Sequence, residues 1–269
     1  MGHTRLGTIP KSQKWAAIVK ELSTGAARAQ ARLPLTEAEV AALAARVLAA
    51  ASAALDRTLS DKGAQLTVGF LAELALWAKA PEWRVAFSNA GLAIGPNDSP
   101  LDVLVRLQAS LDDRLTEHDA HSDIAEMAQR AAGDALAAMA LRGSGSLFPG
   151  AVDETQEFIK GLSTKKGFAT VGHTFFSSFL GRFLNFYLSR LTPAQLGTGR
   201  FEHLGDLAAF ETRLRRHCEQ TALIVRDFSG SWFSKAAFDA RVNPQGTARF
   251  LAVALKKLRS EVERQRAAS

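Results

Sequence analysis

The segment from His173 to Arg190, HTFFSSFLGRFLNFYLSR, constrains the fold more than any other part of the chain. It carries five Phe and one Tyr in eighteen residues, together with three Ser, an Asn and two Arg. At about 100° per residue, its apolar side chains cover an arc of roughly 220° on a helix. Such a wide arc is typical of a helix that is buried on most sides. We therefore expect a central core helix over residues 168–191.

The remaining side of this helix is a strip of small, mostly uncharged side chains, which we call the polar strip. It consists of Thr174, Ser178, Gly181, Arg182, Asn185 and Ser189. A solvated face would carry Glu and Lys, so two arrangements compete. Either a neighbouring helix packs closely on the small residues, or the strip lines a polar cavity in which Arg182 binds an anion. The candidate anion-binding or ligand-binding residues are Arg182, Asn185, Ser178 and His173.

Capping signals and apolar spacing predict an all-α, multi-helix bundle. TEAE at 36–39 is a capping box ahead of an Ala/Leu-rich helix that runs to about residue 60. Ser99–Pro100 and Asn243–Pro244 are further N-terminal signals. Strict polar/apolar alternation over a strand length is scarce. More helices are expected at about 11–23, 65–79, 123–141, 153–162, 168–191 and 204–228.

The helix expected at 204–228 ends where DFSGSWFSK (227–235) combines Gly and Ser with aromatic residues. We predict a turn there that is pinned into the Phe-rich core. The alternative is an exposed loop in which Trp232 and Phe233, beside Lys235, stack on a base.

The amino-acid composition changes sharply near the middle of the chain. Residues 1–146 hold 34 Ala and two Phe, whereas residues 147–269 hold 14 Ala and 14 of the 16 Phe. Ala-rich helices can approach closely, and Phe-rich helices need wider layers. We predict two helical subdomains, 1–142 and 151–269, joined by a Gly/Ser/Pro linker at 143–150. One continuous helical domain with a loop there is the alternative.

The net charge of +6 divides along the same line. Residues 1–146 carry 15 Lys and Arg against 16 Asp and Glu, a net of −1, and residues 147–269 carry 18 against 11, a net of +7. Attraction to an anionic partner, either nucleic acid or an acidic protein surface, therefore belongs to the second half. A solvated helix face with local charge pairing is the alternative. The candidate surface consists of Arg213, Arg216, Lys256, Lys257 and Arg259.

The run DDRLTEHDAHSD at 112–123 is the best candidate for a metal site. Its imidazole and carboxylate groups suit zinc, manganese or iron. The run also lies between two expected helices, where acidic residues solvate a turn and Ser122 or Asp119 can cap the next helix. Because ligand types without a known spacing do not define a site, we expect no cofactor. The candidate ligands are His118, Asp119, His121 and Asp123.

Cys218 is the single cysteine, so this chain has no intrachain disulfide and no Cys-based zinc site. The side chains of His217 and Cys218 point about 100° apart on a helix, so they cannot act together as base and nucleophile. We interpret Cys218 as a small core residue. Phosphate-binding glycine loops, nucleophile elbows and zincin motifs are absent, which excludes the common enzyme classes that sequence alone identifies.

The N-terminal residues include basic side chains but no apolar stretch of the kind found in signal peptides. Every window of about eighteen residues contains a charged or strongly polar group, so we expect no membrane span. We therefore predict a cytoplasmic protein. The excess of Arg over Lys and the abundance of Ala indicate GC-rich codons and favour a bacterial source.

Three functions fit these observations. The first is a non-enzymatic helical protein of the scaffold or adaptor type, which acts through contacts with another protein. The second is a nucleic-acid-associated protein that uses its basic second half and binds in a salt-sensitive way. The third is a ligand-binding protein or enzyme with a pocket beside the polar strip, which requires Arg182, Asn185 and a His to converge on one cavity.

Overall fold

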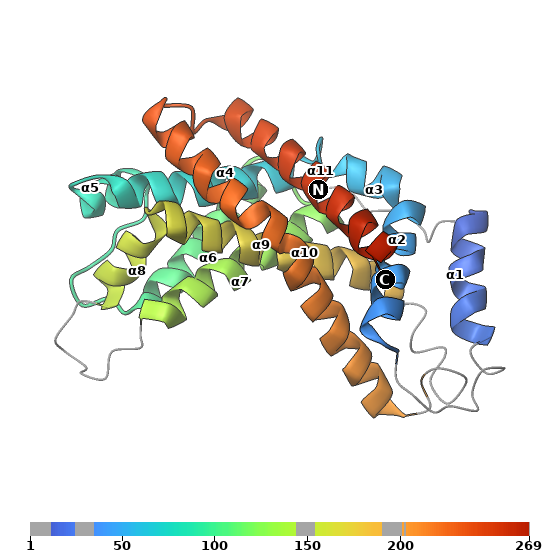
Figure 1. The fold of residues 1–269 in the computed structure, drawn as a ribbon. Coiled ribbons are helices and arrows are strands. Elements are labelled where there is room, and N and C mark those ends of the chain that lie inside the picture. The colour runs from blue at the N-terminus through green and yellow to red at the C-terminus, as the bar shows by residue number, and fades with distance from the viewer. Residues whose placement is uncertain (1–11, 25–34, 144–153, 190–200, 202, 269) are drawn as a thin grey trace.

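The computed structural model describes residues 12–24, 35–143, 154–189, 201 and 203–268, and Figure 1 shows their arrangement. Within these residues the chain forms eleven α-helices and no strand, which confirms the predicted all-α bundle. None of these helices is both long and apolar enough to cross a membrane. The helices are α1 (Gln13–Thr24), α2 (Glu37–Ala50), α3 (Ser52–Arg57), α4 (Lys62–Lys79), α5 (Trp83–Asn89), α6 (Pro100–Glu117), α7 (Asp123–Gly143), α8 (Glu154–Leu162), α9 (Lys165–Leu188), α10 (Leu204–Phe238) and α11 (Pro244–Ala268).

Two helices begin at the capping positions that the sequence predicts. At the start of α2, the Thr36 hydroxyl accepts a hydrogen bond from the Glu39 amide (3.3 Å), and the Glu39 carboxylate accepts one from the Thr36 amide (2.8 Å). Ser99 and Asp102 form the same reciprocal pair at the start of α6, where Pro100 occupies the first turn. These bonds satisfy amide groups that a helix leaves without partners.

Two helical segments in the first half differ from expectation. The helix expected to run to about residue 60 is interrupted at Ala51, whose φ of −101° and ψ of 17° separate α2 from α3. Helix α5 forms where none is predicted. Its Trp83 and Phe87 are buried with their ring centroids 6.1 Å apart, so packing rather than a sequence signal maintains this short helix.

Helix α9 lies at the centre of the molecule, as its wide apolar arc predicts. It packs between α7 and α10, and it also contacts α2 and α8 (Figure 1). The rings of Phe175, Phe179, Phe183 and Tyr187 follow one another along the helix, with centroids 6.2, 6.4 and 5.4 Å apart. Each such pair contributes about 0.5–1.5 kcal/mol beyond its buried area. This row of rings fixes the side of α9 that faces the core.

Buried apolar side chains form a connected cluster that runs through both compositional halves. The cluster extends from Trp15 of α1 to Val262 of α11. Helix α4 contacts both α7 from the first half and α11 from the second. The division into two subdomains stays a prediction, as does its alternative. Of the predicted linker at 143–150, Gly143 ends α7 and the other residues lie outside the described part of the chain.

Helices α9 and α10 approach each other closely where small residues meet. A Cβ on Gly172 of α9 would lie 2.3 Å from the Ser229 hydroxyl oxygen of α10, and a Cβ on Gly230 would lie 2.4 Å from the Lys165 carbonyl oxygen. Both distances are too short for a side chain. Ser229 is fully buried, and its hydroxyl donates to the Val225 carbonyl (2.6 Å) within its own helix. We call this contact the small-residue crossing.

The turn predicted at 227–235 is wrong, and so is the alternative of an exposed loop, because α10 continues as a helix to Phe238. Phe233 is 1% exposed, and its ring stacks on Phe168 of α9 with centroids 4.6 Å apart. A glycine in a helix costs about 1 kcal/mol relative to Ala. The close approach to α9 and the aromatic packing outweigh that cost.

We expect Gly172→Ala to destabilise the fold, because its methyl group would collide with Ser229 in the small-residue crossing. The free energy of unfolding should fall by about 1–3 kcal/mol, in spite of the higher helix propensity of Ala. Urea denaturation followed by circular dichroism measures this change. The matched control is Gly69→Ala within α4, where the nearest atom to the added Cβ, Thr247 Oγ1, is 3.8 Å away. A Gly172→Ala variant as stable as this control would contradict the close crossing.

Candidate functional site

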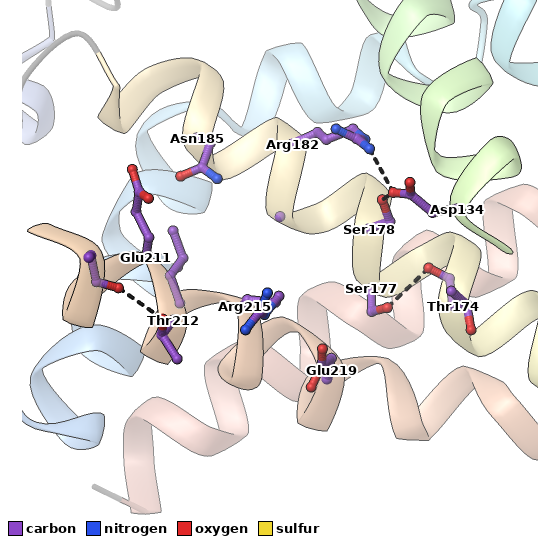
Figure 2. Close-up of a pocket in the computed structure, with 13 residues that line it drawn as sticks. Asp134, Thr174, Ser177, Ser178, Arg182, Asn185, Glu211, Thr212, Arg215 and Glu219 are labelled. Atoms are coloured by element: carbon purple, nitrogen blue, oxygen red, sulfur yellow. Dashed lines mark hydrogen bonds and ion pairs between the residues drawn. The ribbon is translucent and has the colours of Figure 1, made fainter. Parts of the chain in front are cut away.

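A cavity of about 610 Å³ lies between α7, α9 and α10, and Figure 2 shows its lining. We call it the α9–α10 groove. Most of the lining side chains are polar or charged. They are Asp134 from α7; Thr174, Ser177, Ser178, Gly181, Arg182 and Asn185 from α9; and Ala208, Glu211, Thr212, Leu214, Arg215 and Glu219 from α10.

Five of the six residues in the polar strip line this groove. The sixth, Ser189, lines a neighbouring cavity together with Asp123, Asn185 and Phe186. The strip is therefore not sealed by a packed helix. Close packing of α10 on α9 occurs instead at the small-residue crossing. Toward its N-terminus α10 leaves the body of the bundle, and its first turns project away from it (Figure 1).

Arg182 forms a salt bridge with a carboxylate of the same chain, that of Asp134. Arg182 Nη2 lies 2.6 Å from Asp134 Oδ2, and the Ser178 hydroxyl donates to the same carboxylate oxygen (Figure 2). The side chains of Arg182 and Asp134 are 34% and 47% exposed. This charged cluster joins α7 to α9 at one end of the groove, so Arg182 is positioned and partly neutralised before any ligand arrives.

The α10 wall of the groove carries a row of charges at four-residue spacing. Glu211, Arg215 and Glu219 lie on one side of the helix, facing the polar strip (Figure 2). Their side chains form no salt bridge with another described residue. Apart from the Asp134–Arg182 pair, the lining therefore presents two carboxylates against one guanidinium.

The predicted convergence of a histidine with Arg182 and Asn185 does not occur. His173 is half-buried and does not line the groove. Its Nε2 lies 2.9 Å from the Glu219 carbonyl oxygen, so it joins α9 to α10. Among the residues that line the groove there is no His and no Cys. The lining can hold polar or charged groups, but it contains no pair of nucleophile and base of the usual types.

Cys218 is a core residue, as the apolar spacing predicts. Its side chain is 1% exposed, and burial raises the pKa of its thiol to about 12. The neighbouring His217 is also buried. Burial lowers the pKa of His217, which favours its neutral form.

The candidate metal ligands near residue 120 form a turn between α6 and α7 instead of a ligand cluster. Within the described residues, no three His, Cys, Asp or Glu side chains come close enough together to hold a metal ion. His118 caps the end of α6, and Asp119 follows with a positive φ of 46°; both are exposed. The Nε2 atom of His121 lies 3.1 Å from the Thr116 hydroxyl. Asp123 begins α7, so the chain spreads the four side chains around a bend.

Ser122, one of the two predicted caps in this run, is the residue that performs that role. Its hydroxyl accepts a hydrogen bond from the Ala125 amide (2.8 Å) and donates to Asp61 (2.6 Å) of the preceding α4 cap. The hydrogen bond from Ser122 to Asp61 connects the starts of α4 and α7.

Much of the predicted basic surface is engaged in contacts within the chain. Arg216 pairs with Glu37 (2.9 Å), and Arg259 pairs with Asp56 (2.6 Å). The Lys257 ammonium lies 5.4 Å from the centroid of the Phe228 ring. The other two residues, Lys256 and Arg213, lie on α11 and α10, where Lys256 is exposed and Arg213 half-buried. The acidic first half therefore neutralises part of the basic second half.

Sequence reasoning missed Asp134 and the acidic wall of the groove. Asp134 lies 48 residues from Arg182 along the chain, and no local pattern connects them. The four-residue spacing of Glu211, Arg215 and Glu219 is visible in the sequence, but it is equally typical of an exposed helix face. Comparison with protein-family models, curated proteins and solved structures gives no significant match.

We expect Asp134 and Arg182 to be energetically coupled. Asp134→Ala and Arg182→Ala should each lower the free energy of unfolding by roughly 1 kcal/mol, with a coupling of about 0.5–1 kcal/mol because both groups are partly exposed. A double-mutant cycle from urea denaturation measures the coupling. The exposed pair Arg226–Asp227 (3.2 Å) is the control and should show coupling near zero. Additive effects at Asp134 and Arg182 would exclude a structural pair.

We expect Cys218 to resist alkylation in the folded chain. With a thiol pKa of about 12, roughly one thiol in ten thousand is ionised at pH 8, and burial blocks access as well. Iodoacetamide labelling followed by mass spectrometry should be orders of magnitude slower in buffer than in concentrated urea. Labelling of the folded chain at the rate of the unfolded chain would show that the thiol is accessible.

Proposed function

We propose that the chain is a non-enzymatic helical protein of the scaffold or adaptor type, and that it binds a hydrophilic segment of another protein in the α9–α10 groove. The observation that carries this proposal is the open, polar groove along the central helix. A buried helix normally covers such a side with a neighbour. Here hydroxyl, amide and charged groups from three helices face solvent together.

The shape of the groove favours a chain segment over a compact ligand. From Thr174 to Asn185 the polar strip spans eleven residues, or roughly 17 Å along the helix axis. An extended segment of about five residues has the same length. Small-molecule sites are usually lined by apolar side chains with a few polar groups, whereas ten of the thirteen residues that line this groove have polar or charged side chains. A polar polymer segment can make hydrogen bonds along the whole strip.

The charged side chains on the α10 wall indicate which side chains the bound segment should contain. Glu211 and Glu219 are separated by two helical turns, and neither forms a salt bridge with another described residue. A segment with a Lys or Arg side chain would find a carboxylate partner on this wall, and Arg215 between them would donate hydrogen bonds to a carboxylate or carbonyl group. The partner is therefore a hydrophilic segment with at least one basic residue.

A nucleic-acid partner has less support from the arrangement of charge. Two of the five basic residues proposed for it, Arg216 and Arg259, are paired with Glu37 and Asp56. Nucleic acid would have to compete with these carboxylates. Binding that falls steeply between low and moderate salt remains the signature of this second candidate.

Site-specific photo-crosslinking in the native host tests the proposal. A photoreactive amino acid at Thr212, which lines the groove, should capture a discrete protein. The same group at the exposed Gln245, at the start of α11, is the control for non-specific capture. The double charge reversal Glu211→Lys/Glu219→Lys should abolish capture at position 212, and Glu263→Lys on α11 should leave it unchanged.

The outcomes distinguish the candidates. Capture of the same protein at positions 212 and 245, or capture that survives the double charge reversal, would contradict binding in the groove. A crosslinked species that disappears on nuclease treatment would replace the proposal with the nucleic-acid function. Capture of no macromolecule at position 212 would overturn it.

A further inference from the structure

A second cavity, of about 310 Å³, borders α10 on a different side from the α9–α10 groove. At about 100° per residue, the α10 residues that line the two cavities are centred on directions roughly 150° apart around the helix. The second cavity is bordered by the first turns of α2 and the last turns of α11, which lie beside α10 (Figure 1). Its lining consists of Glu37, Ala38 and Ala41 from α2; Arg213, Arg216, His217 and Gln220 from α10; and Arg264 and Gln265 from α11.

Three guanidinium groups converge on this cavity. Arg216 pairs with Glu37 (2.9 Å), and Arg264 binds Glu261 through two hydrogen bonds of 2.8 and 2.5 Å. Three guanidiniums against two carboxylates leave one positive charge in excess. That charge belongs to Arg213, for which the described residues provide no ion pair.

Two residues that line this cavity each carry a buried polar atom that lacks a hydrogen-bond partner. Arg213 Nη1 and His217 Nε2 are both inaccessible to solvent and unpaired with any described residue. His217 as a whole is 7% exposed. Buried polar atoms without partners are rare in folded proteins, and each one calls for a physical reason. Residues 213 and 217 are one helical turn apart and line the same cavity, so a single bound group can satisfy both once the two side chains turn toward the cavity.

The start of α2 adds backbone donors to the same place. The capping box at Thr36 uses the amides of Thr36 and Glu39. The amides of Glu37 and Ala38, in the first turn, have no acceptor within the helix, and both residues line the cavity. The N-terminal end of a helix also carries a partial positive charge that favours anions.

We propose that this cavity is a binding site for a phosphate group, either as inorganic phosphate or as the phosphate of a small phosphomonoester. Arg213 supplies the unneutralised charge, His217 Nε2 donates a hydrogen bond, and the first-turn amides of α2 complete the cradle. The carboxylate of Glu37, held by Arg216, occupies one edge and competes with the anion. A volume of about 310 Å³ lies at the lower end of the roughly 300–1,000 Å³ of small-molecule sites.

Calorimetric titration of the full chain at constant ionic strength tests the site. Inorganic phosphate should bind, and chloride at the same ionic strength should not compete. Arg213→Gln should weaken phosphate binding about tenfold or more, because a charge-assisted donor is lost. Glu37→Gln should strengthen binding, because the competing carboxylate is removed. Arg226→Gln, an exposed residue on the same helix, should leave the affinity unchanged.

A nucleoside monophosphate in place of inorganic phosphate distinguishes the two sources of the group, since tighter binding of the ester identifies a phosphomonoester site. The pH titration of the His217 imidazole, followed by NMR, gives a second readout. A bound anion should raise its pKa toward and above the ordinary value. Absence of phosphate binding, or equal binding by the wild type and Arg213→Gln, would overturn the proposal. So would weaker binding by Glu37→Gln, or losses of equal size in Arg213→Gln and Arg226→Gln.

Discussion

The small-residue crossing between α9 and α10 is the contact on which the rest of the arrangement depends. Gly172 and Gly230 let the two backbones come closer than side chains would permit, and Ser229 fills the remaining space. The aromatic rings of Phe168 and Phe233 stack beside this crossing. Because the close contact involves only a short part of each helix, two long straight helices that cross there move apart with distance from the crossing. Helix α10, with 35 residues, separates from α9 toward its N-terminus.

This separation explains the two cavities on either side of α10. On one side, the polar strip of α9 faces the Glu211–Glu219 wall and leaves the open groove that we propose as a protein-binding surface. On another side, the start of α2 and the end of α11 border a smaller cavity beside Arg213 and His217. The same helix thus offers an acidic wall to one cavity and a basic wall to the other. A partner in the groove and an anion in the cavity would contact the same stretch of α10, and each could stabilise its position for the other.

Local physical rules predicted most of the fold. The width of the apolar arc placed α9 in the core, and the capping pairs at Thr36 and Ser99 fixed two helix starts, because both features depend on residues within a few turns. The continuation of α10 through residues 227–235 was not predictable in this way. Its Gly and Ser oppose a helix locally, and packing on α9 from nearly sixty residues away reverses that preference. The groove was likewise only partly predictable from local sequence. The polar strip was visible in the sequence. The Asp134 carboxylate that binds Arg182 became evident only from the packing of α7 on α9.

Native-state hydrogen exchange along α10 tests most directly whether the crossing governs this arrangement. Amides near the crossing, from Thr221 to Phe233, should exchange only through global unfolding, because one side of this stretch is buried and α10 packs there on α9 and α11. The amides of Ala208 and Ala209, in the first turns of α10 that project away from the bundle (Figure 1), should exchange through local opening at a distinctly lower free energy. Equal protection along the whole helix would contradict the crossing as the controlling contact, since it would mean that both halves of α10 are held by the core to the same degree.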